Sequence, residues 1–331
     1  TGFLQQFEKQ IIFVTGRGNF YLFDIKDLNK KKISLKKINN NFLKLINYDK
    51  NFLAKGPLGI RDVKINNNKI FVSYQKKISE NCYNLAIAES DLKLNITELK
   101  FSDFFSYDEC SLKKNERAWA VLSGGRIVFK DNHIFYTIGE MAIKNISQER
   151  NSYFGKIIKI DLNDPKSPEI IAKGLRNSQG LFYDLDKDLI LITDHAEVGG
   201  DEINIFKKSN EITNFGWPLA SYGKPYGYKK INYLKSHKDN GFKEPAFYFK
   251  EERIGISQII GYKMNNDKLR YLLTTMRAKS IYFLNFLDNE KIEINKKIYL
   301  GERIRDIIKI NDENMYIMTM ETSPAIGLIK F

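Results

Sequence analysis

Short runs of apolar and β-branched residues recur along this chain, and a polar turn rich in Asn and Asp separates the two runs of each pair. Such a pattern predicts β-hairpins, because apolar runs of this length form strands and because Asn and Asp tolerate the left-handed conformation of tight turns. Four segments share the pattern: Leu58–Tyr74, Gly125–Ile138, Gln179–Thr193 and Arg303–Thr319. A weaker copy covers Ile254–Leu273.

The spacing of these hairpins predicts a radial repeat. Copies recur near the roughly 40–50 residues, plus loops, of one four-stranded blade. We therefore expect an all-β chain, with residues 1–331 forming a single six-bladed β-propeller of four-stranded antiparallel blades; counting alone leaves five or seven blades open. A strand at Asn19–Phe23 would pair with the C-terminal strand at Ile326–Lys330 to close the ring. Only Ile143–Tyr153 is a modest helix candidate.

The chain is basic, with a formal net charge of +13 over 331 residues. Its lysines are spread along the sequence, usually beside Asn, and they form no basic amphipathic helix. This distribution indicates a solvated surface and not a nucleic-acid interface. The positive balance still favours an acidic small molecule in any cleft.

No run approaches the ~20 apolar residues of a transmembrane helix, so we expect no membrane span. The sequence begins at Thr1 without Met or a charged leader. We expect a mature periplasmic or secreted form whose export signal has been removed. Cys82 and Cys110 lack the spacing of a zinc site or a redox pair. A disulfide between them and two separate buried thiols are equally compatible with the sequence.

The segment from Gly174 to Pro218 has an unusual density of Gly, Asn, Asp and Arg. Gly permits close approach of the backbone to a ligand, and Arg offers paired donors for carboxylate or phosphate. An Asp-Glu pair beside a Gly-rich turn offers oxygen ligands for a hard cation such as calcium. Elaborate turns between strands would use the same residue types, so composition alone leaves both interpretations open.

Five motifs in order resemble the glucose/sorbosone dehydrogenase family, whose members are soluble, PQQ-dependent aldose sugar dehydrogenases on a six-bladed propeller. The resemblance covers most of the chain. The motifs are Lys55–Gly59, Gly124–Gly139, Phe154–Ile160, Gly174–Pro218 and Gly301–Asp306.

The resemblance implies an anion site for the carboxylates of PQQ in a central funnel lined by arginines. The matching cofactor-binding residues are Arg176, Asn177, Arg277, Arg303 and Arg305. Converging guanidinium groups would hold an acid by charge-assisted, bidentate hydrogen bonds. The alternative is that Arg303 and Arg305 are structural residues at the end of a strand, paired with Asp306.

The resemblance also implies a calcium ion. The family has Gly-Pro where this chain has Ala196 and Glu197, whose carbonyls could keep their place. Asp201 and Glu202 follow and would help to fix the loop and an ion. A turn stabilised by Asp201 without any metal is equally plausible.

The general base of the family is a His four residues before the Arg of the Gly-Gly-Arg strand, and here that position is Leu122. Leu cannot accept a proton. His195, at the rim of the same funnel, is the candidate substitute, whereas His133 and His237 are expected at the solvated surface. Further departures from the family lie at Val121, at Ala54 or Lys55, at Arg277 and at Phe215.

Two functions therefore remain. The first is a binding propeller, a candidate pseudoenzyme whose arginines take PQQ, another anionic small molecule or a partner protein. The second is an oxidoreductase of aldose sugars or other alcohols, dependent on PQQ and calcium, with an altered base. A lyase or lactonase is a minor third option. Such an enzyme needs several carboxylates near the propeller axis to hold a metal ion. The candidates for these carboxylates are Asp194, Glu197, Asp201, Glu202 and Asp306.

Overall fold

The computed structural model describes residues 2–46, 59–79, 82–112, 122–143, 145–227, 230–263, 268–310 and 314–331. Strands dominate these residues, and the chain divides into two compact units. The first unit comprises Thr1–Val121, Asp306–Met320 and Pro324–Phe331, and the second comprises Leu122–Arg305 and Glu321–Ser323.

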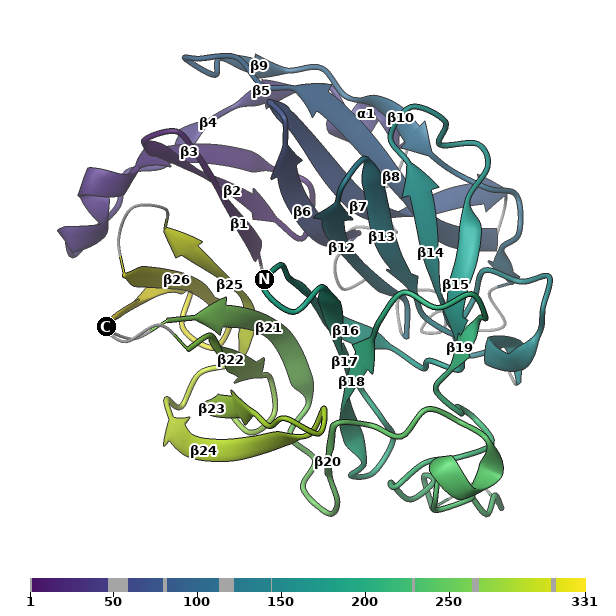
Figure 1. Ribbon diagram of the computed structural model, residues 1–331. Coiled ribbons are helices and arrows are strands. Elements are labelled where there is room, and N and C mark those ends of the chain that lie inside the picture. Colours follow the sequence, from purple (N-terminus) through teal and green to yellow (C-terminus); the bar gives the residue numbers. More distant parts are fainter. Residues whose placement is uncertain are drawn as a thin grey trace. The chain divides into compact units, whose positions relative to one another are not determined.

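The first unit contains three antiparallel sheets and one short pair of strands (Figure 1). The N-terminal sheet is β1 (Gly2–Phe7), β2 (Gln10–Thr15), β3 (Phe20–Asp24) and β4 (Lys36–Lys37). The next is β6 (Ile60–Asn66), β7 (Lys69–Ser79), β8 (Cys82–Asp91), β10 (Ser102–Phe105) and β11 (Ser111–Leu112). The C-terminal sheet is β25 (Ile304–Ile310), whose first two residues belong to the second unit, with β26 (Met315–Met320) and β27 (Ala325–Lys330). A parallel pair joins β5 (Asn39–Asn40) to β9 (Glu98–Leu99).

The second unit contains the other three sheets (Figure 1). The first of them is β12 (Gly124–Lys130), β13 (His133–Ile138), β14 (Lys156–Asp161), β15 (Glu169–Lys173) and β19 (Thr213–Asn214). The second is β16 (Ser178–Asp184), β17 (Leu189–Asp194), β18 (Asp201–Phe206) and β20 (Phe247–Phe249). The third is β21 (Ile256–Tyr262), β22 (Arg270–Thr275), β23 (Ser280–Phe286) and β24 (Ile292–Tyr299).

The expected hairpins are confirmed as β6–β7, β12–β13, β16–β17, β21–β22 and β25–β26. Their turn residues adopt the left-handed conformation that the sequence predicts: φ is +58° at Asn68, +52° at Asp131 and +50° at Asp188. Three sheets have four described strands; β11 and β19 extend two others to five, and the last has three.

In the part of the chain that the structure describes, helix is confined to short turns: α1 (Phe42–Leu45) and the 3₁₀ turns η1 (Ile25–Asn29), η3 (Ile146–Gln148) and η4 (Lys238–Asn240). The helix expected over Ile143–Tyr153 is wrong, since only η3 forms there. Asn145 is left-handed, with φ +60°, and Glu149 is extended, so a single turn fits between them.

Apolar side chains fill the space between neighbouring sheets within each unit. In the second unit, one core cluster joins the β12–β15 sheet to the β16–β18 sheet through Phe135, Ile157, Leu181, Ile192 and Phe206. Another joins the β16–β18 sheet to the β21–β24 sheet. The β16–β18 sheet is therefore buried on both faces, as its continuous apolar runs require.

The expected pairing of the strand at Asn19–Phe23 with the C-terminal strand is not found among the described residues. β3 pairs with β2 and β4, and β27 pairs with β26, so within the described residues the two termini occupy separate sheets. Side chains connect those sheets instead. The Leu4 N–H donates to the Asp306 carboxylate at 3.0 Å, and the Thr319 hydroxyl donates to the Gly2 carbonyl at 3.1 Å. The assignment of residues 1–331 to one domain stays a prediction.

Cys82 and Cys110 form a disulfide, which decides between the two alternatives that the sequence left open. Cys82 is buried at the start of β8, and the bond holds the segment that continues into β11. The bridge therefore ties a two-residue strand, too short to be stable alone, to the long β7–β8 hairpin.

Removing this disulfide should lower the free energy of unfolding by about 3 kcal/mol, because the bond closes a loop across a sequence separation of 28 in the unfolded chain. Urea unfolding of the oxidised protein and of a Cys82→Ala/Cys110→Ala variant would measure the difference. The variant serves as its own control, since reductant should then have no further effect. Equal stability with and without the bond would contradict the prediction.

Candidate functional site

The sequence-predicted residues gather where several strands of the second unit begin. β12 begins at Gly124, β16 at Ser178, and the β17–β18 connection spans the residues between Asp194 and Asp201. Arg303 and Arg305 lie at the start of β25 and belong to the same compact unit. The geometry of the site can therefore be given within one unit.

Asp194 fixes the backbone of the segment that carries Arg176 and Asn177. Its carboxylate accepts the N–H groups of both residues at 2.8 Å and the Ser178 hydroxyl at 2.9 Å. Burial raises the pKa of Asp194, while these donors act in the opposite direction. Asp194 is thus a structural acceptor and is not available to a metal cage.

Arg176 is 2% exposed, and protein groups surround its guanidinium. Nη1 donates to the carbonyls of His195 and Ala196 at 2.8 and 2.9 Å. Nε lies 3.7 Å from the Glu140 carboxylate, and the guanidinium carbon lies 5.4 Å from the centroid of the Trp217 ring. Trp217 in turn donates its indole N–H to Glu140 at 2.6 Å. The positive charge of Arg176 is therefore used to hold the loop at residues 195–196.

Asn177 and Gln179 form a row of side-chain amides. The Asn177 side-chain oxygen accepts from the Gly124 N–H at 3.1 Å and from the Gln179 amide at 2.8 Å. The Gln179 side-chain oxygen accepts from Arg305 Nη1 at 3.4 Å. This amide row, Asn177 and Gln179, links the start of β12 to Arg305.

Arg303 and Arg305 share the carboxylate of Glu321. Arg305 Nε donates to Glu321 Oε1 at 2.7 Å, and Arg303 Nε lies 3.8 Å from Oε2. The Arg303 side chain is 45% exposed and the Arg305 side chain 16%, whereas Glu321 is 10% exposed. The pairing with Asp306 that the sequence offered as an alternative is replaced by pairing with Glu321. The cluster of two guanidinium groups and one carboxylate keeps a net positive charge.

His195 is held by a buried carboxylate. Its Nδ1 lies 2.7 Å from Asp201 Oδ1, and 32% of its side chain is exposed. Asp201 also accepts the N–H groups of Ala196 at 2.9 Å and Ile256 at 3.1 Å. The backbone N–H of His195 donates to the Asn177 carbonyl. One imidazole nitrogen is thus occupied by Asp201, and the ring is anchored next to the amide row.

The acidic residues proposed for calcium each face protein donors. Glu197 accepts from the Tyr233 hydroxyl at 2.9 Å and the Tyr226 N–H at 3.1 Å. Glu202 accepts from Asn204, and the Ala196 carbonyl already accepts from Arg176. No group of three or more His, Cys, Asp or Glu side chains arranged to hold a metal occurs within the described residues. These side chains do not fit a calcium cage.

His237 lies in the interior, so the expectation of a surface position is wrong. It is 1% exposed, and its Nε2 lies 3.5 Å from Glu202. The ring packs against Tyr222, which stacks on Tyr248 with centroids 3.7 Å apart. The Lys-rich sequence around His237 suggested solvent, but the aromatic rings on either side of that loop cover it.

Leu122 precedes β12 in a left-handed conformation with φ +56° and is half-buried. Its carbonyl accepts the Met141 N–H at 3.0 Å. A Cβ at Gly139 would lie 2.1 Å from that carbonyl oxygen, so glycine is needed there for the two segments to approach. The structure thus places Leu122 in a tightly fixed turn next to the amide row.

Arg277 directly follows Met276, whose carbonyl lies 3.4 Å from Arg303 Nη1. Arg277 is exposed, and its backbone N–H donates to the Ile254 carbonyl. Ala54, Lys55 and Val121 lie outside the described residues. Gln179 lies two residues after Asn177 in the Gly174–Pro218 segment, and that position is the sequence signal that could have identified it. The sequence around Glu140 and Glu321 gave no indication of a site. Each of these residues lies far from its arginine partner in sequence and comes close to it only in the folded chain.

Comparison with known sequences identifies the lineage. The model of the glucose / sorbosone dehydrogenase family matches residues 28–327. Aldose sugar dehydrogenase YliI of Escherichia coli (strain K12) is 28% identical over 220 residues, which cover 60% of this chain and 57% of that protein. An uncharacterised protein of Synechocystis sp. is 31% identical over 195 residues, covering 54% of this chain. The matches span 57% and 45% of the lengths of these curated relatives.

Solved structures show the same fold. The soluble aldose sugar dehydrogenase of Escherichia coli in the apo form has a TM-score of 0.74 at 20% identity, covering 99% of this chain and 94% of that one. The PQQ-bound aldose sugar dehydrogenase of Streptomyces coelicolor has a TM-score of 0.68 at 16% identity, covering 96% and 86%. At such identities the likeness concerns the fold, and the predicted six-bladed β-propeller is confirmed. None of the described helices is long and apolar enough to cross a membrane.

Replacing Arg176 with Met should lower the free energy of unfolding by about 3 kcal/mol, because Glu140 would remain buried without its guanidinium partner. Adding Glu140→Gln to that variant should restore part of the loss, since no uncompensated charge is then left inside. A double-mutant cycle in urea measures both effects. Strictly additive losses would contradict the pairing.

Stability should fall as pH rises between about 4.5 and 8, because burial, the largest cause, raises the pKa of Glu202 from 4.5 to about 8. The folded protein keeps that proton across this window and the unfolded chain releases it, so deprotonation favours unfolding by up to about 1.4 kcal/mol per pH unit. Glu202→Gln cannot ionise and should remove this slope. Unfolding measured across the window checks it, and an unchanged slope in the variant would refute the assignment.

Proposed function

Because the chain belongs to the glucose / sorbosone dehydrogenase family, we propose that its second unit binds a small carboxylate ligand, PQQ first among the candidates, at Arg303 and Arg305. The observation that carries this proposal is the sharing of one carboxylate, Glu321, by the two arginines beside the amide row. A ligand carboxylate would meet the donors of Arg303 that Glu321 leaves available.

The exposure of the two arginines supports a binding role. Arg303 is nearly half exposed, with Nη1 3.4 Å from the Met276 carbonyl, so its remaining donors can reach a ligand. Guanidinium groups form paired, charge-assisted hydrogen bonds with carboxylates. The residual positive charge of the Arg303–Glu321–Arg305 cluster favours an acid over a neutral sugar. Arg176 contributes indirectly, by holding the 195–196 loop.

The residues present fit the acidic groups of PQQ. Arg303 and Arg305 would hold its carboxylates, and the amide row would orient polar atoms of the ring. When bound, PQQ supplies a quinone that accepts two electrons. The calcium ion expected with it has no support in the side chains of Glu197, Asp201 and Glu202, which face protein donors, and no step of the proposal uses it.

Sugar oxidation needs a group that accepts a proton from the substrate, whereas ligand binding does not. Leu122 stands at the position of the family base and cannot accept a proton, and general-base catalysis is worth roughly 10²–10⁴-fold in rate. We therefore place ligand binding before sugar oxidation and treat the chain as a candidate pseudoenzyme. A partner protein remains a second possible occupant of the same arginines.

A second candidate function is an oxidoreductase of aldoses or other alcohols, as the name of the YliI relative suggests. The contact between His195 and Asp201 favours it. With Nδ1 on a carboxylate, the other nitrogen of a half-exposed imidazole is left to accept a proton from a hydroxyl. In this function His195 takes the part that Leu122 cannot.

The disulfide between Cys82 and Cys110 supports the proposal of a periplasmic or secreted location. Disulfides persist in oxidising compartments and are rare in the reducing cytosol.

Titration of the purified protein with PQQ, followed by absorbance or calorimetry, tests the binding function. We expect micromolar binding, weakened about tenfold or more by Arg303→Gln, because a charge-assisted contact is worth roughly 1.5–3 kcal/mol. Arg253→Gln is the matched control, since Arg253 is an exposed arginine of the same unit. Absence of PQQ binding at micromolar concentration, or equal weakening in both variants, would sink the proposal.

Dye reduction with a panel of aldoses then separates the two functions. Without activity in the parent protein, a gain of activity in Leu122→His would identify the missing base. With activity in the parent protein, a large loss in His195→Gln would establish the oxidoreductase function and its substitute base. Binding without turnover in every variant would leave the binding function alone.

A further inference from the structure

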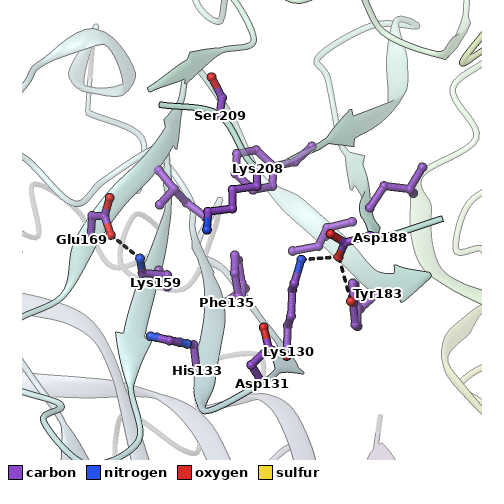
Figure 2. Close-up of a pocket in the computed structure, with 14 residues that line it drawn as sticks. Lys130, Asp131, His133, Phe135, Lys159, Glu169, Tyr183, Asp188, Lys208 and Ser209 are labelled. Carbon is purple, nitrogen blue, oxygen red and sulfur yellow. Dashed lines mark hydrogen bonds and ion pairs between the residues drawn. The ribbon is translucent and has the colours of Figure 1, made fainter. Parts of the chain in front are cut away.

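A second pocket lies at the opposite ends of the strands that carry the proposed site. β12 begins at Gly124, beside the amide row, and ends at Lys130, which lines this pocket. β16 begins at Ser178, also beside the amide row, and its residue Tyr183 lines the pocket near the other end of the strand. The pocket opens between the β12–β15 sheet and the β16–β18 sheet, at the end of the core cluster that joins them (Figure 2). These two strands therefore run from the amide row to the pocket, whose lining contains none of the residues of the arginine cluster.

The floor of the pocket is apolar and its size suits one ring. Phe135 and Phe206 lie there with centroids 6.4 Å apart, together with Ile171, Leu189 and Ile190. The volume of this pocket is about 140 Å³. An apolar cavity of about 150 Å³ holds a benzene molecule, so a single six-membered ring fits this space.

Ion pairs fix two walls of the pocket. Lys130 pairs with Asp188, which also accepts the Tyr183 hydroxyl at 2.8 Å, and the Lys130 ammonium lies 5.1 Å from the centroid of the Tyr183 ring. On the other wall Lys159 pairs with Glu169, its partner across β14 and β15 (Figure 2). Within each pair the positive and negative charges cancel. The two pairs therefore shape the opening of the pocket and add no net charge to it.

Lys208 is a cation whose charge acts on Asp188 without forming an ion pair with it. It is exposed, lines the pocket and makes no hydrogen bond or ion pair with any of the residues that the structure describes. Figure 2 shows its ammonium reaching over the pocket, with Asp131 on the far side of Phe135. A ring seated on Phe135 and Phe206 would bring an acidic substituent to Lys208 and away from Asp131.

We propose that this pocket is a second ligand site, which binds a small aromatic carboxylate with its ring on Phe135 and Phe206 and its carboxylate on Lys208. The ring is recognised by size and by offset or edge contacts with the two phenylalanines. The carboxylate is recognised by charge. The site is independent of the proposed function, because none of its residues belongs to the arginine cluster.

Calorimetry or saturation-transfer NMR of the whole protein with benzoate tests the proposal. We expect a dissociation constant of about 1 mM, as befits a ligand of this size, with weaker binding of the neutral isostere benzamide. Lys208→Gln should weaken benzoate about 3- to 5-fold and leave benzamide unchanged, as expected for one exposed ion pair. Asp131→Asn should strengthen benzoate slightly, because it removes a like charge and Asn tolerates φ +52°.

Two matched variants locate the binding. Lys207→Gln removes the same charge one residue away, where the ammonium pairs with Glu290, and should leave benzoate binding unchanged. Ile171→Phe places a ring in the half-buried lining and should abolish it. Arg303→Gln should have no effect on benzoate, even if PQQ binding is lost. The proposal is overturned if benzoate does not saturate, if Lys207→Gln matches Lys208→Gln, or if Arg303→Gln removes the binding.

Discussion

The arrangement of the candidate site depends on one buried guanidinium. β16 and β25 carry Gln179 and Arg305 and belong to different sheets, so they do not pair with each other. The backbone carbonyls of these two residues therefore need other hydrogen-bond donors. Arg126, 2% exposed, supplies two of them: Nε donates to the Gln179 carbonyl at 2.6 Å and Nη2 to the Arg305 carbonyl at 2.8 Å. The side chains of Gln179 and Arg305 then lie close enough to touch. This contact, together with the Ser257 hydroxyl that donates to the same Arg305 carbonyl at 2.9 Å, helps to set the spacing of Gln179 and Arg305.

Buried residues around the candidate site also have structural roles that hold its loops in place. Arg176, Asp194 and Asp201 each satisfy several backbone groups of the loops around the site, so replacing any of them would leave buried donors or acceptors unpaired. Position 122 differs from these residues. At Leu122 it is the backbone carbonyl, which every residue has, that accepts the Met141 N–H. A change of side chain there would leave this hydrogen bond in place.

The sequence predicted the hairpins and their turns well because both signals are local. Asn68, Asp131 and Asp188 occupy the left-handed positions that their residue types favour. The partners of the charged residues were beyond reach. Glu321 follows Arg305 by 16 residues and Glu140 precedes Arg176 by 36, and neither pairing leaves a trace in spacing. His237 was misjudged for the same reason, since its neighbours in sequence are polar and its neighbours in space are aromatic.

Glu321 gives the arginine cluster its particular character. A protein carboxylate that already accepts from Arg305 competes with an incoming acid, so binding must exchange one carboxylate for another or recruit the free donors of Arg303. Exchange would release Glu321 into a site where it is 10% exposed, at a desolvation cost. A ligand that binds the free donors of Arg303 avoids this desolvation cost, because the Arg303 side chain is nearly half exposed. A ligand with one carboxylate directed at Arg303 and polar ring atoms directed at the amide row therefore fits better than one that must displace Glu321.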